Sequence, residues 1–220
     1  MKYRSVFDII GPVMIGPSSS HTAGAARLGL LARKIFGKEP DRIGIHFYGS
    51  FAETYRGHAT DVAVIGGILS FATDDVRIPE SIEIASEQGI EVSFFREEAI
   101  PVHPNTVRMV LSSGEDTLEV TGISIGGGSV QITQLDGFAL KLSGDHPAIL
   151  ILHKDVYGSI ASVANILAGF QINIGSMEVS RMEKGHNALM VIETDQRIPG
   201  GAVQRIEEKE NIIKVIVLER

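Results

Sequence analysis

The order of strand-like and helix-like segments after residue 147 is the feature that most constrains the fold of this chain. Short runs rich in Val, Ile and Leu indicate strands, and apolar residues at helical spacing indicate helices. They follow one another as strand, helix, strand, strand, helix, strand, which is the ferredoxin-like βαββαβ topology. The predicted elements are residues 148–153, 159–169, 172–181, 188–193, 200–208 and 212–218, with a hairpin turn at Glu183-Lys184-Gly185.

A turn-rich stretch, Ser143-Gly144-Asp145-His146-Pro147, precedes this unit and predicts a boundary between a domain over 1–144 and one over 147–220. In the first region, helical patterns are followed by strand-like runs separated by turn dipeptides, which favours an α+β sandwich. We expect helices at 23–36, 60–71 and 79–88, and strands at 43–49, 91–95, 106–111, 118–125 and 129–135. Gly66-Gly67 reads as a weak point inside the second helix.

The composition of the chain limits its possible chemistry more than it limits its possible folds. The chain of 220 residues has a net charge of −7 and no cluster of Lys and Arg, which argues against nucleic-acid binding. No segment is long and apolar enough to cross a membrane, and residues 1–8 lack the apolar core of a signal peptide, so we expect a cytoplasmic protein. The chain has no cysteine, which excludes disulfides, thiol nucleophiles and thiolate metal ligands. Its chemistry must use oxygen and imidazole groups, or a cofactor held by another chain.

The densest functional signal is Gly16-Pro17-Ser18-Ser19-Ser20-His21-Thr22, directly before the first predicted helix. The start of a helix presents unpaired N–H groups and a partial positive charge. With the hydroxyls and an imidazole added, this segment suits a carboxylate or a phosphate. The alternative is that one serine caps the helix and the others are solvated.

A second signal is Arg56-Gly57-His58-Ala59-Thr60-Asp61, at the start of the second predicted helix, where we expect Thr60 or Asp61 as the N-cap. His58 is then either a functional imidazole at a helix start or a surface histidine. Other candidates have weaker support. We expect structural or exposed roles for His46, His103 and His186, and a hairpin turn rather than a phosphate loop at Gly126-Gly127-Gly128.

In the second domain, the loop His153-Lys154-Asp155-Val156-Tyr157-Gly158 joins the first strand to its helix. Gly158 allows a ligand to approach the backbone closely, and Asp155 offers a carboxylate to an amino group. A plain strand-to-helix turn with Asp155 as a cap predicts the same local structure, so both interpretations stay open.

The strings GPSSSHT and RGHATD resemble the β subunit of two-chain, iron–sulfur-dependent L-serine dehydratases, and the similarity extends over the whole chain. The first region also resembles the allosteric-substrate-binding domain of some phosphoglycerate dehydrogenases. The last part resembles an ACT domain, a regulatory module that usually binds amino acids and often pairs with a second copy. The His-x-Asn-x-Pro-Gly pattern of serine-sensing ACT loops has Asp155 for Asn and Tyr157 for Pro here.

The resemblance implies conversion of L-serine to pyruvate and ammonia with a [4Fe-4S] cluster. Because cysteine thiolates hold such clusters, it would be bound by an α-subunit partner. The resemblance further implies that His21 and His58 are the catalytic base and its positioning group, without deciding which is which. Ser18, Ser19, Ser20 and Thr22 would hold the substrate carboxylate, and Asp155 and Gly158 would contact a regulatory ligand. The alternatives are a non-catalytic amino-acid sensor, in which an anion-binding domain and an ACT module control another enzyme by association, and a phosphate-binding structural subunit.

Overall fold

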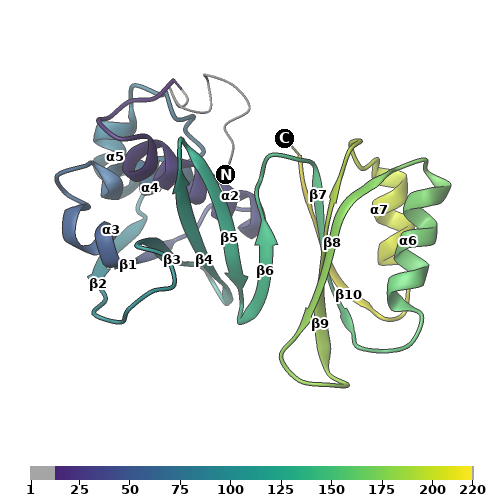
Figure 1. Ribbon diagram of the computed structural model, residues 1–220. Coiled ribbons are helices and arrows are strands. Elements are labelled where there is room, and N and C mark those ends of the chain that lie inside the picture. Colours follow the sequence, from purple (N-terminus) through teal and green to yellow (C-terminus); the bar gives the residue numbers. More distant parts are fainter. Residues whose placement is uncertain (1–12, 220) are drawn as a thin grey trace. The chain divides into compact units, whose positions relative to one another are not determined.

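The computed structural model describes residues 13–219, so the segment 1–8, on which the signal-peptide prediction rests, lies outside the described residues. The chain forms two compact units, which are divided in sequence between Asp136 and Gly137 (Figure 1). Both units combine helices with a sheet, which confirms the predicted α+β class. None of the helices in the described part of the chain is long and apolar enough to span a membrane.

The six-stranded sheet has the order β2-β1-β3-β4-β5-β6. Strands β1 and β2 are parallel, whereas β1–β3, β3–β4 and β4–β5 are antiparallel. Five of these strands were predicted within a few residues, and β6 was not. The bounds are β1 (Arg42–Tyr48), β2 (Glu91–Arg96), β3 (Asn105–Ser113), β4 (Asp116–Gly126), β5 (Ser129–Leu135) and β6 (Phe138–Leu142).

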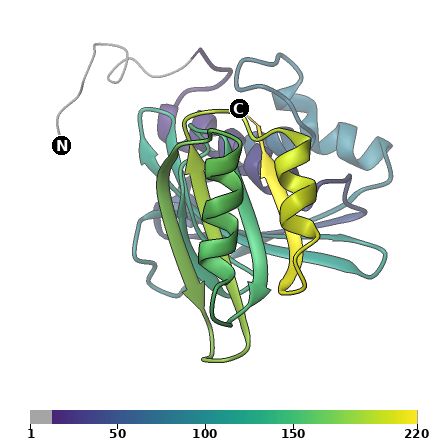
Figure 2. The same cartoon turned by 90° about the vertical axis from the view of Figure 1, so that its right-hand side faces the viewer.

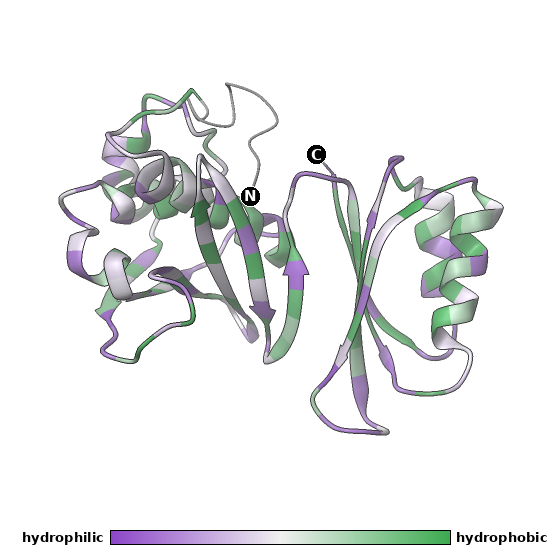
Figure 3. Cartoon of the chain, in the orientation of Figure 1, coloured by the Kyte–Doolittle hydropathy of each residue, from purple (hydrophilic) through white to green (hydrophobic). Residues whose placement is uncertain are grey.

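The helices of the first unit include two that lie on one side of the sheet, α2 and α4 (Figure 1). Along β1, Ile43, Ile45 and Phe47 alternate with more exposed residues and face the core. Figure 3 shows the same alternation as coloured bands along β4 and β5. The helices are η1 (Ser19–Ala23), α2 (Gly24–Phe36), α3 (Gly49–Thr54), α4 (Thr60–Ile68), η2 (Ile78–Glu80) and α5 (Ser81–Glu87), of which η1 and α3 were not predicted.

Helices α2 and α4 pack closely because glycines meet backbone at their crossing. A Cβ atom on Gly29 would lie 2.2 Å from the carbonyl oxygen of Val64, and one on Gly67 would lie 2.0 Å from that of Ala26. Gly67 of the predicted weak point Gly66-Gly67 therefore lies at this crossing. A side chain at Gly67 would keep the two helices apart, and the close packing offsets the lower helix propensity of glycine.

The second unit contains the predicted βαββαβ arrangement, which confirms the ferredoxin-like topology. Its four-stranded sheet has the antiparallel order β10-β7-β9-β8. Helices α6 and α7 lie side by side on one face of this sheet (Figure 2) and bury a core that includes Ile151, Val163 and Met190. The bounds are β7 (Ala148–Lys154), α6 (Ser159–Gly169), β8 (Ile174–Arg181), β9 (Asn187–Thr194), α7 (Gly200–Glu207) and β10 (Ile212–Leu218).

Candidate functional site

The serine-rich loop winds into the short π-helical segment η1, which continues directly into α2. Ser18 is the N-cap: its Oγ accepts a hydrogen bond from the backbone N–H of His21 at 3.1 Å. Gly16 has φ +119°, and a Cβ there would lie 2.4 Å from the Cγ2 of the buried Thr22, so only glycine fits. Ser19 takes part through its backbone, since its carbonyl accepts the N–H of Gly24. The loop thus combines a helix cap with a cluster of side chains.

His21 is held by hydroxyl groups on both of its ring nitrogens. Ser20 Oγ lies 3.0 Å from Nδ1, and Ser50 Oγ lies 3.0 Å from Nε2. The fully buried Phe51 meets the imidazole edge-on, with ring centroids 5.2 Å apart. Ser50 and Phe51 were not among the predicted site residues. The Gly49-Ser50 pair at the end of a predicted strand was the signal that could have identified them.

The structure brings the two predicted histidines together, with ring centroids 4.8 Å apart. The hydroxyl of Thr22 donates a hydrogen bond to the main-chain carbonyl of His58 at 2.9 Å. The predicted cap of α4 was wrong. The N-cap position is taken by Ala59, in the left-handed conformation at φ +55° and with no side-chain cap bond. Asp61 lies inside the first turn of α4, where its carboxylate accepts the N–H of Val62 at 2.9 Å.

Polar atoms at the site are buried without partners. Within residues 13–219, His58 Nδ1 and Thr60 Oγ1 have no hydrogen bond, nor does the buried hydroxyl of Ser124 on β4. Buried polar groups are nearly always paired, so such atoms mark a site that a ligand or water completes. Desolvation by burial and the nearby His58 lower the pKa of His21, which favours its neutral form.

Iron–sulfur ligands are missing from this site. The chain has no cysteine, and the described residues contain no group of three or more His, Asp or Glu side chains that could hold a metal ion. The residues present therefore do not fit a [4Fe-4S] cluster, which needs thiolate ligands.

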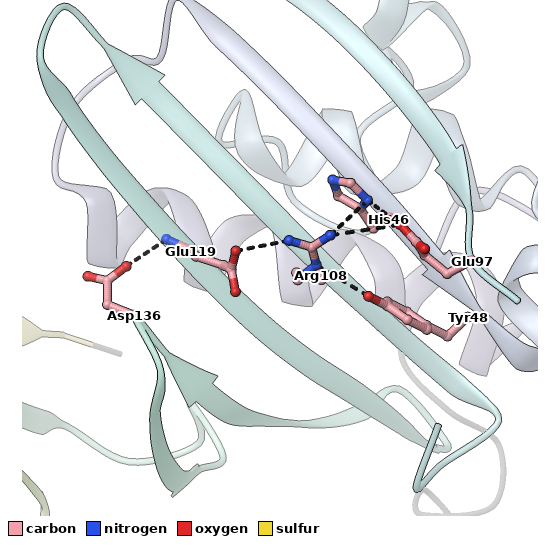
Figure 4. A network of polar contacts seen from close by, with 6 residues as sticks. All are labelled: His46, Tyr48, Glu97, Arg108, Glu119 and Asp136. Atoms are coloured by element: carbon pink, nitrogen blue, oxygen red, sulfur yellow. Dashed lines mark hydrogen bonds and ion pairs between the residues drawn. The ribbon is translucent and has the colours of Figure 1, made fainter. Parts of the chain in front are cut away.

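A second polar cluster lies on the first sheet and involves none of the predicted site residues (Figure 4). His46 Nδ1 is 2.6 Å from Glu97 Oε1, and Arg108 Nη1 donates to Glu119 Oε2 at 2.9 Å. The imidazole of His46 also stacks on Phe95, with centroids 4.5 Å apart. These contacts join β1, β3 and β4 to the residues around the end of β2. Gly126-Gly127-Gly128 forms the predicted hairpin turn between β4 and β5.

The β7–α6 loop borders a pocket of about 690 Å³, lined among others by Asp155, Gly158 and Arg181. One carboxylate oxygen of Asp155 is already engaged, because Oδ2 accepts from Arg181 Nη1 at 2.9 Å and from the Gly185 N–H at 3.1 Å. The Gly185 N–H, followed by Arg181, holds the pKa of Asp155 below its usual value. Gly158 has φ +84° and is the N-cap of α6. Both predicted residues thus lie at the rim of one pocket.

The fold defines the class: a two-unit α+β protein whose second unit is an ACT domain, a family whose model matches residues 148–211. The model described as serine dehydratase beta chain matches residues 5–88. The probable L-serine dehydratase beta chain of Bacillus subtilis (strain 168) is 60% identical over 215 residues, covering 98% of both chains. The L-serine dehydratase beta chain of Peptoniphilus asaccharolyticus is 37% identical over 87% of both. The chain therefore belongs to the family of L-serine dehydratase beta chains.

More distant similarity extends to another enzyme. The D-3-phosphoglycerate dehydrogenase of Synechocystis sp. (strain ATCC 27184 / PCC 6803 / Kazusa) is 27% identical over 83% of this chain but only 33% of its own length.

Proposed function

We propose that this chain is the β subunit of a cytoplasmic L-serine ammonia-lyase, which converts L-serine to pyruvate and ammonia. The [4Fe-4S] cluster would be held by the cysteines of an α subunit, because this chain offers no thiolate. The observation that carries the proposal is the His21–His58 pair beside the serine loop. The names of the two similar beta chains support the substrate and the need for an α partner.

His58 is our candidate for the base that removes the α-proton of serine. Both ring nitrogens of His21 already contact hydroxyls, whereas the described residues give the ring of His58 no hydrogen bond. Because Nδ1 of His58 is buried, the proton would pass to Nε2. The electron pair of the Cα–H bond forms the Cα–Cβ double bond as hydroxide leaves Cβ. The resulting aminoacrylate tautomerises and takes up water to give pyruvate and ammonia.

When bound to the α subunit, the cluster would supply a Lewis acid for the departing hydroxide. The contribution of this chain is different. The hydroxyl of Ser19 would hold the substrate carboxylate beside η1, reducing the negative charge that opposes loss of the α-proton. The hydroxyls of Ser18 and Ser20, for which the sequence predicts the same role, instead contact His21. The hydroxyl of Thr22 is already donated to His58, so we assign it to placing His58 rather than to the carboxylate.

Co-expression of this chain with a cysteine-bearing α subunit tests the proposal. We expect a brown, oxygen-sensitive complex that forms pyruvate from L-serine. The proposal would be overturned by a coloured complex that is inert toward L-serine. Pyruvate formation by this chain alone, purified without iron, would be equally decisive against it.

A regulatory function for the second unit is the other candidate, and the pocket at Asp155 and Gly158 favours it. The pocket has room for an amino acid, and the other oxygen of Asp155 would accept hydrogen bonds from the ammonium group. We propose that an amino acid binds there and that the ACT domains of two copies pair. If the chain proves to have no part in catalysis, this pocket would make it an amino-acid sensor.

A further inference from the structure

We propose that Ser50 is a positioning residue that accepts a hydrogen bond from His21 and fixes its neutral imidazole with the proton on Nε2. That Ser50 matters for catalysis rests on the proposed function. That Ser50 accepts a hydrogen bond from His21 rests only on the hydrogen-bond geometry around His21. Ser50 would act only through His21, leaving His58 as the unpaired base.

The hydroxyls around Nδ1 decide where the proton lies. Ser20 Oγ is 3.0 Å and Ser18 Oγ 3.5 Å from this nitrogen, and the two hydroxyls are 3.3 Å from each other. Ser18 Oγ already accepts the N–H of His21, so its own hydrogen points away from that bond. We assign that hydrogen to Ser20 Oγ and the hydrogen of Ser20 to Nδ1, which is then the acceptor. In a neutral imidazole the other nitrogen then carries the hydrogen.

That hydrogen on Nε2 faces Ser50 Oγ, 3.0 Å away. The hydrogen bonds form one series from Ser18 through Ser20 and His21 to Ser50. His21 and Ser50 are 29 residues apart in the sequence, so this series joins two separate segments of the chain. Desolvation of His21 disfavours its charged form, so the fixed species is the neutral ring.

The backbone places Ser50 with little freedom. Gly49 has φ +53°, and a Cβ there would lie 2.7 Å from the carbonyl oxygen of Pro104, so a side chain is excluded. Gly49 also forms a bridge with Asn105, and Thr54 Oγ1 donates to the carbonyl of Ser50 at 2.7 Å. Strand β1 therefore passes directly into α3 at a position that only glycine fits, and the first turn of α3 presents Ser50 to His21.

Nitrogen-15 NMR of the uniformly labelled full chain at pH 8 tests the proposal without any partner. The two imidazole signals of His21, identified by their loss in His21→Asn, report which nitrogen is protonated. We expect a protonated Nε2 in the wild type. In Ser50→Ala the two signals should move toward each other as the tautomers mix, and Ser50→Thr should retain the wild-type pattern. Ser112→Ala, which removes a hydroxyl from β3, is the matched control.

A wild-type His21 protonated on Nδ1 would overturn the assignment, and this result needs no variant to fold. Unchanged His21 signals in a folded Ser50→Ala would overturn it equally. In the αβ complex, kcat of Ser50→Ala should fall by up to about 100-fold through misplacement of His21, with recovery in Ser50→Thr. If the NMR result holds while the wild-type complex makes no pyruvate, the proposed function fails and the role of Ser50 stands.

Discussion

The hydroxyl of Thr22 donates to the main-chain carbonyl of His58 at 2.9 Å, across 36 residues of sequence. This bond connects η1 to the turn before α4 and joins the two motifs that the sequence shows separately. Thr22 is only 1% exposed, so its hydroxyl has no competing solvent. One side chain thereby controls the position of the candidate base.

Replacing Thr22 with valine keeps the shape and removes the donor. Because the partly buried carbonyl of His58 then loses its partner, we expect the free energy of unfolding to fall by about 0.5–1.5 kcal/mol. Urea unfolding followed by circular dichroism measures it, with Thr22→Ser as the variant that keeps the hydroxyl. Equal stability of the valine variant and the wild type would show that this bond contributes nothing.

If His58 is the base, replacing it should impair the proposed αβ complex far more than replacing the exposed His186. His58→Ala should lower kcat by about 10²–10⁴-fold, the usual contribution of a general base. The visible absorbance of the cluster should persist, because this chain supplies no ligand to it. His186→Ala, on an exposed hairpin, should leave kcat unchanged. Near wild-type turnover in His58→Ala would remove this residue from the mechanism.

The crossing of α2 and α4 predicts a strong effect of a single methyl group. Gly67→Ala would place its Cβ 2.0 Å from the carbonyl oxygen of Ala26, so the helices must separate and the midpoint of thermal unfolding should fall. Gly169→Ala at the end of α6 meets no atom within 4 Å and should be neutral or stabilising by up to about 1 kcal/mol. Comparable midpoints for the two variants would contradict the packing argument.

The lowered pKa of His21 predicts how stability depends on pH. The unfolded chain, with an ordinary histidine pKa of about 6.5, binds a proton before the native state does as the pH falls. The His21 contribution should therefore be lost as the pH drops through about 6.5 toward the lowered native pKa. Urea unfolding at pH 7.5 and pH 5 should show a smaller loss for His21→Asn than for the wild type. An identical loss in both would mean that His21 titrates normally in the native state.

The pocket of the second unit predicts that Asp155 affects ligand binding. Calorimetric titration of the full chain with L-serine should show binding weakened by about 10-fold or more in Asp155→Ala, since a hydrogen bond to a charged group is lost. Asp195→Ala, which instead loses a contact with Asn173, is the matched control. Equal dissociation constants for the wild type and Asp155→Ala would place the ligand elsewhere.

The local sequence pattern was enough to predict most of the helices and strands and the two motifs of the candidate site. The βαββαβ order after residue 147 follows from alternating apolar runs and helical spacing, because burial of one face imposes these periods on the sequence. The motifs at Ser18–Thr22 and at His58 were found from residue type and from their position before helices. The absence of cysteine predicts that another chain would hold any iron–sulfur cluster.

Only the tertiary structure decided what these motifs do together. The 4.8 Å separation of His21 and His58, the bond from Thr22 to His58 and the contact of Ser50 with His21 all join residues far apart in sequence. The role of Gly67 also depends on tertiary packing, because the absence of a side chain there lets α2 approach α4. Such contacts depend on how elements pack, and packing is set by the whole set of buried side chains rather than by any one segment.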